Sequence, residues 1–136
     1  MEITQNGKKI VYVSQDNYLI VDPGSSRNTV YYCDSATSCV ILVAAGYSSR
    51  LSKDVAVISH LSRPGRFEDY FSKVEESFGT EDAVSVYASG ANPPQRYHKK
   101  DGSEDATALR NAKQVIEWAT SGRIKLEQLS LKLGQA

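Results

Sequence analysis

The chain has few of the residues that build covalent or metal-held scaffolds. Its 136 residues include only two cysteines and two histidines. Two cysteines cannot form a disulfide framework, and a chain of this length buries roughly two-thirds of its unfolded surface without such help. A zinc site usually takes a closely spaced cysteine pair, whereas five residues separate Cys33 from Cys39. We therefore expect a single domain over residues 1–136, with no cofactor and no metal.

An excess of charge and a long apolar run are also missing. Sixteen Lys and Arg residues balance sixteen Asp and Glu residues, so the formal net charge is zero. This balance favours neither nucleic acid nor an anionic membrane as a partner. The longest apolar run, residues 40–45, is too short to span a bilayer, and the first residues lack the apolar core of a signal peptide. We expect a cytoplasmic protein, or one delivered into a host cell cytosol if it is an effector.

Familiar nucleotide and hydrolase motifs are absent as well. There is no Gly-x-x-x-x-Gly-Lys-Ser/Thr loop, no Gly-x-Gly-x-x-Gly and no Gly-x-Ser-x-Gly elbow. What remains is a pattern of strands and helices. Apolar and β-branched runs predict strands at residues 9–14, 18–21, 29–33, 39–45, 54–60 and 82–89.

Helical spacing of apolar residues predicts two helices. One carries Phe67 to Phe78 and is closed by Gly79, and the other carries Leu109 to Ala119 and is closed by Gly122. Residues 90–102 predict a long polar loop between a strand and the second helix. Residues 123–133 fit either a strand or a short terminal helix. This order predicts an α/β (α+β) fold, in which β-sheets are packed with two or more helices.

Cys39 stands where a hydroxyl-rich turn meets an apolar strand, and His60 ends the next predicted strand. A thiol at one strand start and an imidazole at another strand end can meet at one sheet edge, as thiol-nucleophile catalysis requires. Backbone N–H groups at the turn, including that of Cys39, could then stabilise an oxyanion. The alternative is that Cys39 is a small buried hydrophobe and that His60 is a surface residue. His98, flanked by lysines, is the second candidate base.

Cys33 lies six residues before Cys39 and allows three interpretations. It is a core residue, a ligand in a metal site, or a resolving thiol that forms a reversible disulfide with Cys39. The first needs no chemistry, and the second lacks an obvious fourth ligand. The third would make the pair a redox switch.

The segment around Cys39 resembles a known family of thiol hydrolases. Asp34–Val43 resembles the catalytic segment of protein N-terminal asparagine amidohydrolase, and Ser38-Cys39-Val40 resembles the nucleophile turn of the chemoreceptor glutamine deamidase CheD. In that superfamily a His follows at the end of the next strand, often with a Pro soon after; here these are His60 and Pro64. Cytotoxic necrotizing factors and related deamidating toxins share the cysteine–histidine fold.

Two later segments resemble the same superfamily in the same order. Residues 84–92 are similar to a strand that ends in Gly-Gly-Ala, and residues 109–115 resemble the stretch in which an Arg-Asn pair opens a helix. The resemblance implies a four-layer α/β/β/α-like fold. It also implies a cysteine-dependent amidohydrolase that deamidates a glutamine, or an N-terminal asparagine, of a protein substrate and releases ammonia through a thioester on Cys39.

Carried over by motif, Cys39 is the nucleophile and His60 is the base and acid. The family has a hydroxyl-bearing residue six positions before the cysteine, which orients the histidine; this chain has Cys33 there. A thiol is a weak donor and acceptor, so Thr37, Ser38 or Ser59 would have to take over this role, or activity would be low. A non-catalytic protein-binding domain on the same fold is therefore the main alternative, beside the Cys33/Cys39 redox switch.

Overall fold

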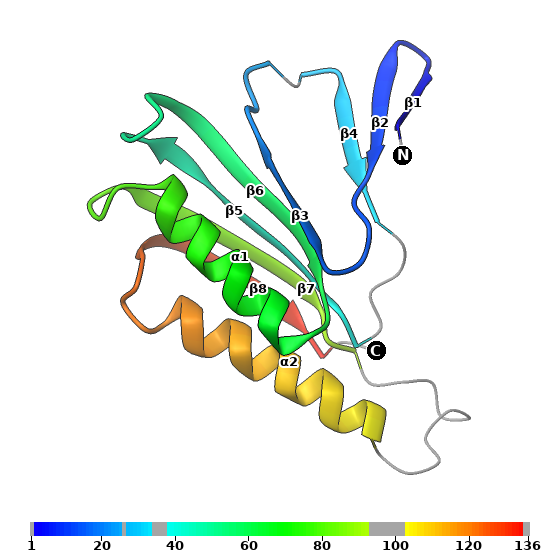
Figure 1. Cartoon of the computed structure of the whole chain (residues 1–136), viewed down its shortest axis with the longest axis vertical. Coiled ribbons are helices and arrows are strands. Elements are labelled where there is room, and N and C mark those ends of the chain that lie inside the picture. The colour runs from blue at the N-terminus through cyan, green and yellow to red at the C-terminus, as the bar shows by residue number, and fades with distance from the viewer. Residues whose placement is uncertain (1, 26, 34–37, 93–102, 135–136) are drawn as a thin grey trace.

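The computed structural model describes residues 2–25, 27–33, 38–92 and 103–134 (Figure 1). Eight strands and two helices are formed by these residues. In chain order they are β1 (Glu2–Gln5), β2 (Lys8–Tyr12), β3 (Asn17–Val21), β4 (Thr29–Tyr32), β5 (Val40–Ser48), β6 (Lys53–Leu61), α1 (Pro64–Ser77), β7 (Ala83–Gly90), α2 (Ser103–Ala119) and β8 (Lys125–Leu133). None of the helices in these ranges is long and apolar enough to cross a membrane.

The strands form two separate sheets. The larger has the order β3-β6-β5-β7-β8; its first four strands are antiparallel neighbours, and β8 joins β7 in parallel. The smaller has the order β1-β2-β4, with β2 and β4 parallel. In Figure 1 this smaller sheet stands beyond β3, away from both helices. The five-stranded sheet is therefore the framework of the domain.

Both helices pack on the same face of the five-stranded sheet, because their apolar residues recur at helical spacing (Figure 1). Phe67, Tyr70 and Val74 of α1 are fully buried against it. The ring of Phe71 stacks on that of Trp118 in α2, with 4.5 Å between the centroids. Burying a side chain of this size stabilises the fold by roughly 1.5–3 kcal/mol, so these aromatic contacts hold the two helices together on the sheet.

The α+β class expected from the pattern is confirmed, and both expected helices are present. Two details differ. The four-layer arrangement is not what the described residues form, because α1 and α2 share one face of one sheet and contact each other. Strand β1 was not expected, since three of its four residues are polar; it forms by pairing with β2 across the Asn6-Gly7 turn, where both residues have positive φ. In the segment 123–133, where strand and helix were both open, Lys125–Leu133 forms a strand.

Candidate active site

Cys39 and His60 lie at the same end of the two central strands. Cys39 immediately precedes β5, and His60 is the last but one residue of β6. These strands are antiparallel neighbours, with Val40 opposite Leu61 and Ile41 opposite His60. The register therefore places the start of β5 beside the end of β6, as the sequence pattern led us to expect.

The two side chains also share a face of the sheet. Val40, Leu42 and Ala44 belong to the core under the helices, while Ile41 and Val43, which alternate with them, are only half-buried. Strand residues alternate between faces, so Cys39, Ile41 and His60 lie on the face away from the helices. Cys39 is a diagonal neighbour of His60, and diagonal neighbours lie about 7–8 Å apart between their backbones, within reach of longer side chains.

The imidazole of His60 is enclosed and has no polar contact. The residue is 4% exposed, and neither Nδ1 nor Nε2 has a hydrogen-bond partner among the described residues. The thiol of Cys39, which is half-buried, is thus not hydrogen-bonded to it. An unsatisfied buried polar group costs about 1–3 kcal/mol. Such a group calls for a physical explanation, and a reactive role is one.

The backbone around His60 is held by a turn that the sequence interpretation did not single out. Asp16, at the β2–β3 turn, donates its N–H to the carbonyl of His60. Its Oδ1 accepts hydrogen bonds from the N–H groups of Ser62 (2.9 Å) and Arg63 (3.0 Å), and its Oδ2 accepts from Arg63 Nε (3.1 Å). An aspartate in a turn is a common local signal, but its partners lie more than forty residues away along the chain.

The protonation of Asp16 reflects these contacts. Burial of the carboxyl opposes its ionisation, but the backbone hydrogen bonds from Arg63 and Ser62, and the Arg63 guanidinium, outweigh that effect. The pKa of Asp16 therefore lies below its usual range. An ionised Asp16 ties the β2–β3 turn to the segment just after His60.

The backbone around Cys39 is held from two sides. The N–H of Ala91 donates to the carbonyl of Cys39 (2.7 Å). Asn111 Nδ2, from α2, donates to the carbonyl of Ser38 (2.8 Å). Arg110, which precedes Asn111 in α2, donates from Nη2 to the carbonyl of Ser62 (3.3 Å). The Arg-Asn pair quoted in the family resemblance thus touches the chain next to both Cys39 and His60.

The hydroxyl and thiol candidates for orienting the imidazole fare differently. The expectation that Ser59 orients the imidazole is corrected by the structure. The hydroxyl of Ser59 donates to the carbonyl of Leu42 (3.0 Å). As the neighbour of His60 in a strand, Ser59 lies on the opposite, helix-covered face. Ser38 is half-buried beside Cys39. Cys33 follows β4 and is half-buried; like Cys39, it is a thiol rather than half of a disulfide. Thr37 and His98 lie outside the described residues.

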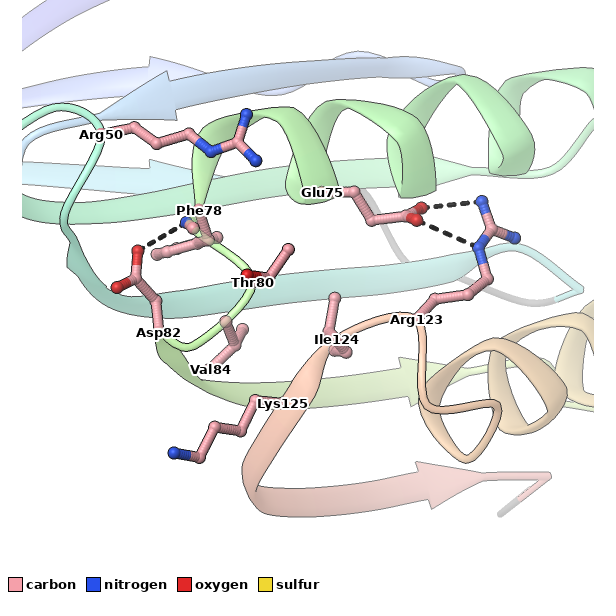
Figure 2. Close-up of a pocket in the computed structure, with 10 residues that line it drawn as sticks. Arg50, Glu75, Phe78, Thr80, Asp82, Val84, Arg123, Ile124 and Lys125 are labelled. Carbon is pink, nitrogen blue, oxygen red and sulfur yellow. Dashed lines mark hydrogen bonds and ion pairs between the residues drawn. The ribbon is translucent and has the colours of Figure 1, made fainter.

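A hollow lies at the other end of the sheet (Figure 2). Its lining includes Arg50, Glu75, Asp82, Arg123 and Lys125. Arg123 Nη2 is paired with Glu75 (2.7 Å) and with Glu68 (2.8 Å), and Asp82 accepts from the N–H of Gly79 (2.6 Å). Its lining contains no cysteine or histidine, so this hollow does not belong to the Cys39 site.

No protein-family model matches the chain, and no curated protein matches it in sequence. Within the described ranges, no three His, Cys, Asp or Glu side chains gather closely enough to hold a metal ion. The site at the β5 and β6 ends must therefore be interpreted from its own residues.

Proposed function

We propose that the chain is a cysteine-dependent amidohydrolase that deamidates a side-chain carboxamide of a protein substrate. The observation that carries the proposal is the placement of Cys39 and His60 at adjoining strand ends on one face of the sheet. A nucleophile needs a base within reach, and the enclosed His60 has two ring nitrogens with no hydrogen-bond partner among the described residues.

The reaction follows from these two groups. His60 takes the thiol proton of Cys39, and the thiolate attacks the carboxamide carbon, which leaves a tetrahedral oxyanion. The imidazolium then protonates the leaving nitrogen, ammonia departs, and an acyl thioester remains on Cys39. His60 next deprotonates a water molecule, which attacks the thioester. The product is a carboxylate, and both the thiol and the neutral imidazole are restored.

The substrate class comes from the family resemblance. A glutamine side chain of a folded protein and an asparagine at a protein N-terminus both supply the carboxamide. A thiol nucleophile is preserved in a reducing compartment, so we place the activity in the cytosol of the producing cell or of a host cell.

The experiment that tests this function follows ammonia release. The protein is incubated with peptides that carry an N-terminal Asn and with folded proteins rich in surface Gln. We expect ammonia release, together with the mass change of amide-to-acid conversion, and loss of both in Cys39→Ser. Release that persists in Cys39→Ser, or no conversion of any carboxamide substrate, would contradict the proposal.

A second candidate is a non-catalytic protein-binding domain on the same fold. It is favoured by the missing hydrogen bonds of the imidazole, because no described group orients His60. It is also favoured by Cys33 in the position where the family has a hydroxyl. In a domain of this kind Cys39 would be acylated no faster than an ordinary thiol, whereas the amidohydrolase would form the acyl thioester faster.

A further inference from the structure

The peptide that joins Ser38 to Cys39 is held by a buried side chain from a distant helix. Asn111 is fully buried, and its Nδ2 donates to the carbonyl of Ser38 at 2.8 Å, across 73 residues of sequence. Buried hydrogen bonds are shielded from competing water, and the loss of one partner leaves the other unsatisfied at a cost of about 1–3 kcal/mol. Asn111 therefore fixes the direction of the Ser38 carbonyl.

The same contact fixes a second group. A trans peptide unit is planar, and its C=O and N–H point in opposite directions. The structure has no cis peptide bond among the described residues. When Asn111 holds the carbonyl of Ser38, it also sets the direction of the N–H of Cys39, which belongs to the same peptide unit.

That N–H is left unused by the sheet. Val40 lies opposite Gly90, so Cys39 extends the β5–β7 ladder by one residue, opposite Ala91. Residues in a hydrogen-bonded antiparallel pair exchange two bonds. Here Ala91 N–H donates to the Cys39 carbonyl (2.7 Å), but no described residue accepts the return bond from the N–H of Cys39.

The backbone of β7 explains why the return bond is missing. Gly90 has φ 111° and Ala91 has φ 50°, so the strand leaves its extended conformation where it passes Cys39. Positive φ is uncommon for a residue with a Cβ, and the N–H of Gly134 donates to the carbonyl of Gly90 (2.9 Å), which helps to hold the bend. The bend leaves the N–H of Cys39 without an acceptor among the residues that the structure describes.

We propose that Asn111 is a positioning residue, which aims the N–H of Cys39 at the oxyanion formed during acyl transfer to that cysteine. The proposal rests on the proposed function and adds the source of its oxyanion stabilisation. Preorganised backbone donors of this kind are effective because they need no reorientation as charge develops. The bend at Ala91 keeps β7 from accepting a hydrogen bond from this N–H, and Asn111 sets the direction of the N–H.

Arg110 supports the orientation of the Asn111 amide. Its Nη2 donates to Asn111 Oδ1 and to the carbonyl of Ser62, each at 3.3 Å. A donor at Oδ1 favours the amide orientation in which Nδ2 faces Ser38. The pair thus joins the backbone segments that precede Cys39 and follow His60.

Two reactions of the same thiol separate aiming of the N–H from activation of the sulfur. Iodoacetamide alkylates a thiolate by direct displacement of iodide, and no oxyanion forms. p-Nitrophenyl acetate acylates it through a tetrahedral oxyanion, which then expels p-nitrophenolate. In Asn111→Asp, which has nearly the same shape but no side-chain N–H donor, we expect the rate of acylation to fall about tenfold or more. Removing one oxyanion donor outright typically costs about 10²–10³ in rate. The rate of alkylation should stay within about twofold of wild type.

A matched control distinguishes this effect from general loss of stability. Ser48 is the last residue of β5, the strand that Cys39 precedes. It is fully buried, and its hydroxyl donates to the carbonyl of Ser77 at 2.5 Å. Ser48→Ala also removes a buried side-chain-to-backbone bond, but at the far end of β5. We expect it to leave the ratio of acylation to alkylation unchanged. All variants carry Cys33→Ser, so that only Cys39 reacts.

Each outcome bears on the proposal. An unchanged ratio in Asn111→Asp, with wild-type acylation intact, overturns the role of Asn111 and leaves the proposed function standing. A wild-type protein that is alkylated but never acylated at Cys39 overturns the proposed function and this inference together. If Asn111→Asp does not fold, Arg110→Met replaces it as the test. Arg110 is exposed, and its loss removes the hydrogen bond that orients the Asn111 amide. A lowered ratio supports the role of Asn111 as an oriented donor, and an unchanged ratio refutes it.

Discussion

The N–H of Asp16 donates a hydrogen bond to the carbonyl of His60, so the β2–β3 turn is fastened to β6 at the candidate base. The carboxylate of the same residue accepts hydrogen bonds from Ser62 and Arg63 just beyond. The position of the imidazole therefore depends on a turn about forty residues earlier in the chain. We therefore expect Asp16 to contribute to the stability of the fold as well as to the position of His60.

Asp16→Asn should destabilise the fold by about 1.5–3 kcal/mol at neutral pH, the usual range for hydrogen bonds to a charged group. The measurement is urea unfolding followed by circular dichroism. The side chain of Asp16 is 11% exposed, so solvent screens these bonds only partly. As a control, Asp69→Asn removes an exposed pair with Arg66 and should change stability by less than about 1 kcal/mol. Equal effects of the two variants would contradict the bracing role.

The effect of Asp16→Asn on the free energy of unfolding should depend on pH. Because the pKa of Asp16 is lowered in the folded protein, its stabilising effect is present above the ordinary aspartate pKa of about 3.9. The effect is lost as pH falls through the lowered folded value. We therefore expect the stability difference between wild type and Asp16→Asn to be full at pH 7 and to shrink steadily below about pH 4. A difference that grows on acidification would refute this assignment.

Tyr70→Phe tests which face of the sheet carries the site. The hydroxyl of Tyr70 donates to the carbonyl of Val57 at 2.8 Å on the helix-covered face, and burial raises the pKa of Tyr70. Loss of this buried bond should cost about 1 kcal/mol in unfolding free energy. The rate at which iodoacetamide labels Cys39 should not change, because Cys39 lies on the other face. A large loss of labelling rate would contradict the assignment of faces.

Cys33 offers a test of the family resemblance. A hydroxyl is a better hydrogen-bonding group than a thiol, so Cys33→Thr should raise the rate of acylation of Cys39 by p-nitrophenyl acetate. A fall in this rate would argue that the thiol itself is needed. Peptide mapping after mild oxidation then tests the redox switch: a Cys33–Cys39 bridge would favour it, and unlinked thiols would dispose of it.

The sequence pattern predicted that Cys39 and His60 lie at adjoining strand ends, because this relationship is local in the chain. β5 and β6 are consecutive antiparallel strands with a short connection, so a cysteine before one and a histidine at the end of the other must adjoin. The same alternation rule rejects Ser59, which neighbours His60 in the strand. The rule applies only if β6 runs through Ser59 and His60 without a bulge, and the sequence pattern alone did not establish this.

The supporting contacts could not be read from the sequence in the same way. The bond from Asn111 to Ser38 joins residues 73 positions apart, and the bond from Asp16 to Ser62 spans 46. Both depend on how α2 and the β2–β3 turn pack, which no local periodicity encodes. The shared face of the two helices has the same origin, since the stack of Phe71 on Trp118 is a tertiary contact.

The most direct test of the Cys39–His60 pair is the rate of alkylation of Cys39 by iodoacetamide at neutral pH, in the Cys33→Ser background. A base within reach increases the reactive thiolate fraction. We expect labelling about tenfold or more faster than that of a cysteine in an unfolded peptide, and loss of this advantage in His60→Ala. A rate equal to that of the peptide and unchanged by His60→Ala would contradict the account, as would a loss caused by His98→Ala instead.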